Sequence, residues 1–216
     1  MFSLYSYFRS SSSYRVRIAL HYKKIPFEYK PVHLLKEGGE QHLPSYKEIN
    51  PAEEVPTLVT PDKKTLSQSM AIICYLEDIK PLPALFPKDP YLKALTLQIC
   101  EMINSGIQPI QNLKVLQALG NQFHLDREGQ LSWARQWITK GFLAIEKILK
   151  THAKTFSLGD SLTAADLFLV PQIYNARRFQ VDLSPFPTIT QIEKNCLSLP
   201  AFQKAHPDNQ PDTPKT

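Results

Sequence analysis

The stretch FSLYSYFRSSSSYRVRIALHYKKIPFEYKPV, residues 2–32, decides the fold of the N-terminal part of the chain. Apolar and aromatic residues are interleaved with serines at 2–7, a pattern that predicts a strand. Apolar residues recur at helical spacing over 14–22 and predict a helix, and residues 27–32 predict a second strand. A strand, a helix and a strand in this order form a βαβ unit, so we expect the two strands to be parallel.

The residues that follow complete an α/β domain. After an irregular polar stretch at 35–50, we expect a strand at 57–60, a turn at 61–63, a return strand at 65–66 and a helix at 69–79. An order of βαβ followed by ββα is that of a thioredoxin-like domain. The sequence therefore predicts such a domain over residues 1–80.

A proline-rich connector separates this domain from a helical one. Four prolines fall within residues 81–90, which predicts a stiff linker. Residues 91–216 then form an all-helical domain, because every later apolar pattern has the helical period. The expected helices are Leu92–Leu119, interrupted by Pro109, Leu131–Leu149, Thr163–Phe179, Ile189–Leu197 and Ala201–Ala205. We expect the last ten residues to be an extended tail.

Composition and charge exclude several classes of protein. The chain has 216 residues and a net charge of +5, from 25 basic and 20 acidic residues that are dispersed. Dispersed basic residues argue against a nucleic-acid partner but suit a small anionic substrate. The longest apolar run, Ala71–Leu76, is far shorter than the ~20 residues that span a bilayer, and the start lacks a secretory pattern. We expect a cytoplasmic protein without a membrane partner.

The cysteines and histidines give no sign of a metal site or a disulfide framework. Cys74, Cys100 and Cys196 are widely spaced and sit among apolar residues, which predicts buried free thiols. The six histidines show no ligand spacing, and no glycine-rich phosphate loop is present. A metal ion and a nucleotide cofactor are therefore not expected.

Four serines at positions 10–13 join the first strand to the first helix. One serine is enough to cap a helix, so four are an excess. In a thioredoxin-like domain a sulfur reacts at this helix N-terminus, where backbone N–H groups and the helix dipole favour a thiolate. Because no cysteine is present here, a reactive sulfur must arrive on a ligand. A thiol peptide fits this site.

The chain resembles the zeta class of glutathione transferases. The resemblance is carried, in order along essentially the whole chain, by SSSSYRVRIAL, NPAEEVPTL, QSMAIICYLE, GIQPIQNLKVL, FSLGDSLTAADLFLVPQIYNARRFQVDLSPFPT and HPDNQPDTP. It implies a glutathione-dependent homodimer with a thioredoxin-like domain for glutathione and a helical domain for an acidic substrate. The implied reaction is the cis–trans isomerisation of maleylacetoacetate to fumarylacetoacetate in tyrosine and phenylalanine breakdown.

The resemblance implies a role for each serine of the first motif. Ser10 matches the serine that contacts the glutathione sulfur, and Ser11 matches its neighbour. Ser12 stands where the usual motif has a cysteine, and Tyr14 replaces the usual tryptophan. Ser10, Ser11 and Ser12 are thus the expected catalytic and glutathione-binding residues.

Further glutathione contacts are implied in the same domain. Val55 precedes a proline expected in the cis form, which leaves the Val55 backbone free to pair with the cysteinyl unit. Gln68 and Ser69 are expected at the γ-glutamyl end, and Gln41 at the glycyl side. Ser69 could instead be an ordinary helix cap.

The helical domain supplies candidates for the rest of the site. Gln108 and Asn112 lie with Ser105 on one face of the expected helix, either as a solvated face or, by resemblance, as the wall of the pocket near glutathione. Arg178 matches the pocket arginine of the family, although a cation also suits a helix end. Arg9 and Arg15 are further candidates for substrate carboxylates, and Arg15 also for glutathione.

One acidic residue in the helical domain is expected to be structural. Asp166 follows Thr163 at the spacing of a capping box, with Leu162 and Leu167 placed as the hydrophobic staple.

Two other functions remain open. The first is a glutathione transferase acting on α-haloacids or other small electrophiles, and the second is a non-catalytic adaptor on the same scaffold. The serine motif and the Gln68–Ser69 pair argue against the adaptor.

Overall fold

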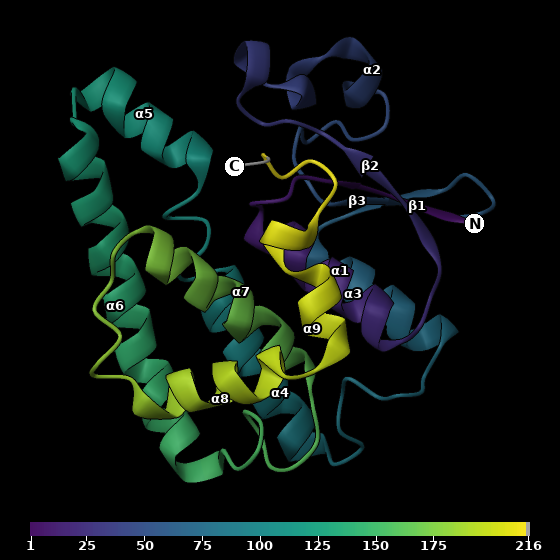
Figure 1. Cartoon of the computed structure of the whole chain (residues 1–216), viewed down its shortest axis with the longest axis vertical. Coiled ribbons are helices and arrows are strands. Elements are labelled where there is room, and N and C mark those ends of the chain that lie inside the picture. Colours follow the sequence, from purple (N-terminus) through teal and green to yellow (C-terminus); the bar gives the residue numbers. More distant parts are fainter. Residues whose placement is uncertain (215–216) are drawn as a thin grey trace. The chain divides into compact units, whose positions relative to one another are not determined.

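The computed structural model describes residues 1–214 and divides into two compact units (Figure 1). Unit 1 comprises Met1–Leu85 together with residues 197–214, and unit 2 is Phe86–Cys196. The division after Leu85 falls inside the proline-rich segment 81–90. Residues 197–214 belong to unit 1, although the sequence pattern predicted them in the helical domain.

A four-stranded sheet forms the centre of unit 1. Its strands are β1 (Phe2–Ser6), β2 (Phe27–Pro31), β3 (Thr57–Val59) and β4 (Thr65–Ser67), in the order β2-β1-β3-β4. β1 and β2 are parallel with Phe2 opposite Phe27, while β3 is antiparallel to both β1 and β4. The predicted βαβ–ββα order is confirmed.

α1 (Ser11–Tyr22), α3 (Ser69–Ile79) and the C-terminal α9 (Pro200–Ala205) pack together in unit 1, with α1 in contact with both of the others. The apolar core between sheet and helices is fully buried and includes Leu4, Ile18, Leu20, Leu58, Ile72, Ile73 and Leu76. The stretch expected to be irregular instead contains the short helices η1 (Lys36–Gly38), η2 (Glu40–His42) and α2 (Pro44–Lys47).

The prediction of an extended tail differs from the structure. Residues 207–209 form the short helix η3 (Pro207–Asn209), and Asp212 accepts a hydrogen bond from the backbone N–H of Phe8 at 2.9 Å. The segment therefore folds back on unit 1, because partners that lie far away in the sequence are available to it.

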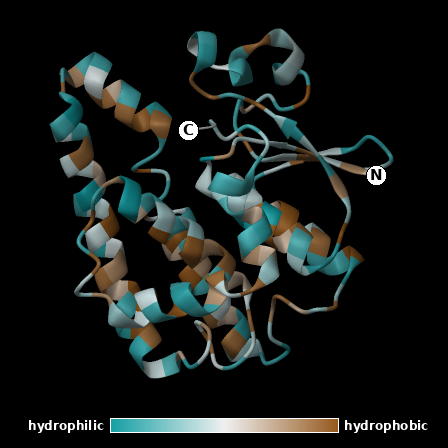
Figure 2. Cartoon of the chain, in the orientation of Figure 1, coloured by the Kyte–Doolittle hydropathy of each residue, from teal (hydrophilic) through white to brown (hydrophobic). Residues whose placement is uncertain are grey.

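Unit 2 is helical. Its helices are α4 (Pro90–Asn104), α5 (Leu113–Phe123), α6 (Arg127–His152), α7 (Ala164–Arg178) and α8 (Pro187–Leu197). α7 packs on α4, and twelve of its fifteen residues are buried. Figure 2 shows hydrophobic and hydrophilic residues interspersed along α6, as expected for a helix with one face on the core.

The single helix expected at residues 92–119 is wrong. α4 ends at Asn104, residues 105–112 are turns, and α5 starts at Leu113. Pro109 has no N–H to donate and its ring clashes with the preceding turn of a helix, so it breaks the helix instead of kinking it. Gly106 adds a second weak point.

The N-terminus of α7 has the predicted capping box. The Asp166 carboxylate accepts hydrogen bonds from the backbone N–H groups of Thr163 and Ser157, both at 2.8 Å. Asp166 is fully buried, and it accepts a further bond from the Thr163 hydroxyl at 3.2 Å. These contacts tie the loop before α7 to the helix, so Asp166 has a structural role.

Cys100 and Cys196 are buried cysteines outside any disulfide within residues 1–214, and Cys74 is a half-buried one. Burial raises the pKa of Cys196, which keeps its thiol protonated. Within residues 1–214, no helix combines the length and the apolarity that crossing a bilayer requires.

Candidate functional site

The turn between β1 and α1 places Ser10 at the start of α1. Ser10 is the N-cap residue, with extended backbone (φ −71°, ψ 117°), and its hydroxyl oxygen accepts the Ser13 N–H at 3.2 Å. Its own N–H donates to the carbonyl of Tyr7 at 3.0 Å. The serine hydroxyl is thereby held at the helix terminus, as the sequence predicted.

Ser11 and Ser12 form the first turn of α1 beside this cap. Ser11 is buried and Ser12 is half-buried. The first N–H groups of a helix have no intrahelical partner, and the dipole makes this end partly positive. Arg9 stands just before the cap, with its guanidinium 6.0 Å from the ring centres of Tyr7 and Phe8. The turn thus favours a bound anion.

Arg15 lies in the interior of unit 1. Its side chain is fully buried, and its Nη1 donates to the hydroxyl of Ser69 at 3.1 Å. Because the guanidinium has no exposed surface, its burial does not favour a direct contact with substrate or glutathione, and that role of Arg15 stays a prediction. Arg15 instead connects α1 to the first residue of α3. The sequence showed its charge but not its burial.

Gln68 and Ser69 begin α3. Gln68 is the N-cap residue, with a left-handed backbone (φ 70°), and Ser69 is the first helical residue, so Ser69 is not the cap. Gln68 is exposed and donates from Nε2 to the Glu54 carboxylate at 3.3 Å. Glu54 was not among the residues predicted for the site, although its position next to Val55 in the sequence could have indicated it.

Val55 precedes a cis peptide bond to Pro56, as expected. Its side chain belongs to a buried cluster that includes Tyr7 and Phe8. Because Thr57 on β3 pairs with Tyr5 on β1, the residues before β3 approach the residues after β1. The structure therefore brings Val55 close to the turn that carries Ser10.

Gln41 is buried and has an unused acceptor. Its Nε2 contacts His42 Nε2 at 3.0 Å and donates to the carbonyl of Leu34 at 3.5 Å, while its Oε1 has no hydrogen-bond partner among residues 1–214. Gly39 (φ +106°) lies so close that a Cβ there would be 2.4 Å from the Gln41 amide. A buried acceptor without a donor costs ~1–3 kcal/mol, which a ligand N–H would recover.

A chain of polar contacts links Gln41 through His42 to Glu53, two residues before Val55. His42 Nδ1 lies 2.5 Å from a carboxylate oxygen of Glu53, and Lys47 lies 3.1 Å from the other oxygen. The hydrogen bond with His42, followed by the one with Lys47, lowers the pKa of Glu53. Glu53 therefore stays ionised and holds the Gln41 segment near residues 54–55.

In unit 2, Gln108 and Asn112 lie outside regular helix. Gln108 is in the turns after α4, and its N–H donates to the carbonyl of Ile103 at 2.8 Å. Asn112 is the N-cap of α5, where its Oδ1 accepts the Lys114 N–H at 3.2 Å. The expected common helical face with Ser105 is therefore absent, because the helix is broken between these residues.

Arg177 and Arg178 end α7 and have different surroundings. Arg177 forms an ion pair with Glu193 of α8 at 2.5 Å. Arg178 is exposed, donates to the Asn175 side chain at 3.1 Å, and lies 5.4 Å from the ring centre of Phe179. Both arginines are exposed, but the charge of Arg177 is neutralised by Glu193.

Comparisons with known proteins match both units. Residues 9–79 match the N-terminal domain of glutathione S-transferases, and residues 117–204 match their C-terminal domain. The chain is 50% identical over 211 residues to the maleylacetoacetate isomerase of Mus musculus, which covers 98% of this chain and 94% of that protein. A bacterial maleylpyruvate isomerase described as a zeta-class transferase superposes with a TM-score of 0.95 at 40% identity, over 98% of this chain and 100% of that one. The chain belongs to the zeta class of glutathione S-transferases.

A ligand-bound zeta-class relative is also similar. Maleylacetoacetate isomerase from Anaeromyxobacter dehalogenans, solved with glutathione in its active site, has a TM-score of 0.89 and 44% identity, over 99% of this chain and 98% of that one. In this chain, the segment that matches the N-terminal domain, residues 9–79, contains Ser10, Val55, Gln68 and Ser69. The family assignment therefore supports glutathione as the cofactor of unit 1.

Proposed function

We propose that this transferase catalyses the glutathione-dependent isomerisation of maleylacetoacetate to fumarylacetoacetate. The observation that carries the proposal is the serine hydroxyl held at the N-terminus of α1, in a turn that contains no cysteine. Relatives named maleylacetoacetate isomerase, about half identical over nearly the full chain, support the same reaction.

Ser10 is the donor to the glutathione sulfur. A hydroxyl that accepts the Ser13 N–H still has its own O–H to donate. Lowering the pKa of a bound thiol by about 2 to 3 units needs roughly 3–4 kcal/mol of preference for the thiolate. One hydrogen bond to a charged group supplies ~1.5–3 kcal/mol, and the helix terminus ~0.3–2 kcal/mol. Together they suffice without a protein base, with Ser11 and Ser12 contributing the N–H groups of the first turn.

The rest of the glutathione site is assigned to four residues of unit 1. The unused Gln41 acceptor suits an N–H of the glycyl side, and the Val55 backbone suits strand-like pairing with the cysteinyl unit. Gln68 and Ser69 offer the start of α3 to the γ-glutamyl carboxylate. When bound, glutathione supplies a thiolate that adds to the double bond, permits rotation about it, and leaves again.

The substrate is dianionic, and accessible cations are assigned to its carboxylates. Arg178 of unit 2 and Arg9 of unit 1 each carry an accessible or half-buried guanidinium. Gln108 and Asn112 are assigned to the substrate side as polar wall residues. We place the enzyme in the cytoplasm as a homodimer, which is typical of the family; light scattering on the purified protein tests the dimer.

The decisive experiment is an isomerisation assay on maleylacetoacetate with and without glutathione. We expect turnover only with glutathione, and the amount of glutathione should be unchanged at the end. Loss of one glutathione for each product formed would assign the protein to the conjugating transferases. Faster turnover of an α-haloacid than of maleylacetoacetate would replace the isomerase with the dehalogenating alternative.

Ser10→Ala tests the residue that carries the proposal. We expect turnover at neutral pH to fall about 10- to 150-fold, the value of one charge-assisted hydrogen bond. Activity should recover in part as the pH rises and the thiolate forms without help. Ser13→Ala is the matched control, because the Ser13 hydroxyl lies one turn away and has no partner among residues 1–214. An equal loss in both variants would remove Ser10 from the mechanism.

A further inference from the structure

Arg17 is a buried cation that the reaction itself does not use. Its side chain on α1 has 0% exposure, yet it is among the largest buried side chains of the chain. Its guanidinium donates to the carbonyl oxygens of Ala205 at 3.0 Å, Tyr7 at 3.2 Å and Phe8 at 3.0 Å, and to the Ser6 hydroxyl at 3.1 Å. One side chain thus joins the end of α9 to the residues that lead into the Ser10 turn.

Asp212 holds the same turn from the other side. Its carboxylate accepts the backbone N–H of Phe8 at 2.9 Å and the hydroxyl of Tyr29 at 2.6 Å. Burial, followed by the hydrogen bond to Asp212, raises the pKa of Tyr29, so the phenol remains a donor. Both backbone polar groups of Phe8 are therefore engaged, the N–H by Asp212 and the carbonyl by Arg17.

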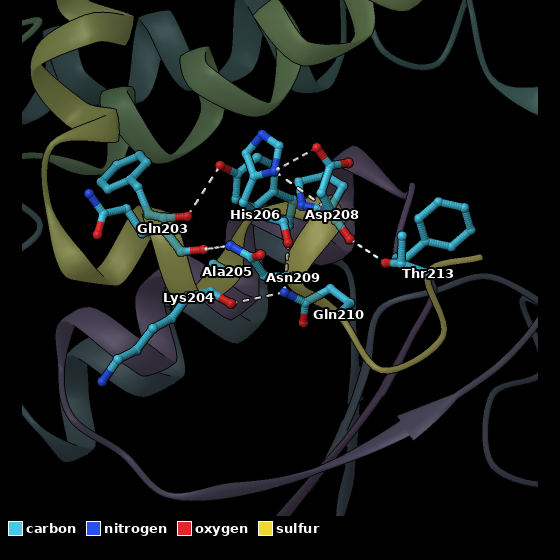
Figure 3. A network of polar contacts seen from close by, with 12 residues as sticks. Gln203, Lys204, Ala205, His206, Asp208, Asn209, Gln210 and Thr213 are labelled. Atoms are coloured by element: carbon cyan, nitrogen blue, oxygen red, sulfur yellow. Dashed lines mark hydrogen bonds and ion pairs between the residues drawn. The ribbon is translucent and has the colours of Figure 1, made fainter. Parts of the chain in front are cut away.

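The C-terminal segment that presents Ala205 and Asp212 is folded by its own side chains (Figure 3). Gln210 Nε2 donates to the carbonyls of Lys204 at 2.9 Å and His206 at 2.8 Å, and Asn209 Nδ2 donates to Gln203 at 2.7 Å. The carbonyls of Gln203 and His206 also accept the backbone N–H groups of His206 and Asn209, so the side-chain amides add to the backbone bonds at the end of α9. The segment therefore has a fixed structure and can hold the residues that it contacts in place.

We propose that Asp212 and Arg17 are positioning residues for Ser10, and that the C-terminal segment 205–212 is a strap that fixes the β1–α1 turn. The link is short. Tyr7 accepts both from Arg17 and from the Ser10 N–H, and Phe8 is fixed at both of its polar groups two residues before Ser10. The catalytic effect rests on the proposed function of Ser10 as donor to a thiolate.

A fixed turn matters because of what the Ser10 hydroxyl must do. Donors that are already oriented stabilise a developing or fixed charge without reorganisation, and small displacements weaken a hydrogen bond steeply. Releasing Phe8 loosens the cap residue while leaving every side chain of the glutathione site in place. The strap therefore acts on the stability of the thiolate and less on the retention of the tripeptide.

Asp212→Ala tests the strap, with Asp212→Asn as the conservative variant and Asp208→Ala as the matched control. Asp208 lies on the same segment with a side chain 72% exposed, and its carboxylate pairs only weakly with His206 at 3.5 Å. The readouts are amide hydrogen exchange at Phe8, the pH profile of kcat, and KM for glutathione.

For Asp212→Ala we expect exchange at Phe8 to accelerate at least tenfold, about 1.4 kcal/mol. kcat at neutral pH should fall about three- to tenfold, and its pH profile should move by roughly 0.5 to 1 unit to higher pH. KM for glutathione should change less than kcat. Asp212→Asn should recover much of the loss, since its amide oxygen can still accept the Phe8 N–H, and Asp208→Ala should stay within about twofold.

Two results overturn the proposal. One is unchanged exchange at Phe8 in Asp212→Ala, and the other is faster exchange with an unshifted pH profile and intact kcat. Hydrogen exchange needs no substrate, so it reports on the strap even if the isomerase assay fails. A lack of glutathione-dependent turnover in the unaltered enzyme would overturn the proposed function and leave the exchange result standing.

Discussion

α1 and α5 both begin at a polar cap that the sequence marks as a candidate site residue, Ser10 and Asn112, yet they are embedded very differently. Nine of the twelve residues of α1 are buried, and α5 has no buried residue. α1 is held by the sheet, by α3 and by the strap, whereas α5 has α6 as its main neighbour. Resistance to local opening follows buried contacts, so α1 is rigid and α5 is locally weak.

This difference suits the roles proposed for the two helices, thiolate binding near α1 and substrate binding near α5. A thiolate site depends on donors that are oriented before glutathione arrives. A substrate site gains from a neighbouring helix that can adjust, provided that its cap keeps it folded between turnovers. Three experiments test or refine the comparison.

Arg17→Met should abolish the greater resistance of α1 to local opening. The substitution removes the Arg17 donor from three carbonyls and one hydroxyl in the interior. The Tyr7 carbonyl keeps the Ser10 N–H, whereas the Ala205 and Phe8 carbonyls lose a buried hydrogen bond worth ~1–3 kcal/mol each. We expect a loss of at least about 3 kcal/mol in the free energy of unfolding by urea, and exchange in α1 as fast as in α5. Arg135→Met on α6, which removes a surface ion pair with Glu128, should cost less than ~1 kcal/mol. A similar loss of unfolding free energy in Arg17→Met and Arg135→Met would show that the burial of Arg17 adds nothing to the stability of α1.

Asn112→Ala should weaken α5 alone. Removal of an N-cap costs about 1 kcal/mol, so amide exchange in residues 113–123 should rise roughly fivefold while exchange in α1 stays the same. Asn112→Asp keeps a capping oxygen and is the matched control. If Asn112 also contacts substrate, the aspartate variant will raise KM for the dianionic substrate although α5 remains folded. An unaffected KM in both variants would make Asn112 a cap and nothing more.

His21, near the end of α1, should give the smallest effect. Burial, then the positive charges of Lys204 and Arg17, lowers the pKa of His21 below its ordinary value of 6.5. The unfolded chain therefore binds the proton more readily, and stability is lost as the pH falls through 6.5. The imidazole is only half-buried, so we expect a few tenths of a kcal/mol between pH 7.5 and 5.5. His21→Gln should flatten this dependence in urea titrations, and an unchanged slope would argue against it.

Local signals in the sequence identified much of the molecule correctly. The strands, α1, the capping box of α7 and the Ser10 cap were predicted because each depends on residues within a few positions of one another. The same locality explains the failure at residues 105–112, where apolar residues keep the helical period and obscure the break at Gly106 and Pro109.

What the sequence could not show depends on distant partners. Phe8 and Asp212 are 204 positions apart, and nothing near Asp212 indicates that its carboxylate meets a backbone N–H of the first turn. Arg15 and Arg17 were visible as charges, but their complete burial follows from the packing of α1 between α3 and α9. Their supporting roles therefore required the structure.

Unit 1 is built from both ends of the chain, while unit 2 is one continuous stretch. A ribosome makes Phe86–Cys196 before it makes α9 and Asp212, so unit 2 has all of its residues while unit 1 still lacks its last piece. Nascent molecules consequently carry an α1 face that awaits α9, and the cap at Ser10 acquires its final support only after residues 205–212 have emerged. The glutathione site is thus among the last features of this enzyme to mature during synthesis.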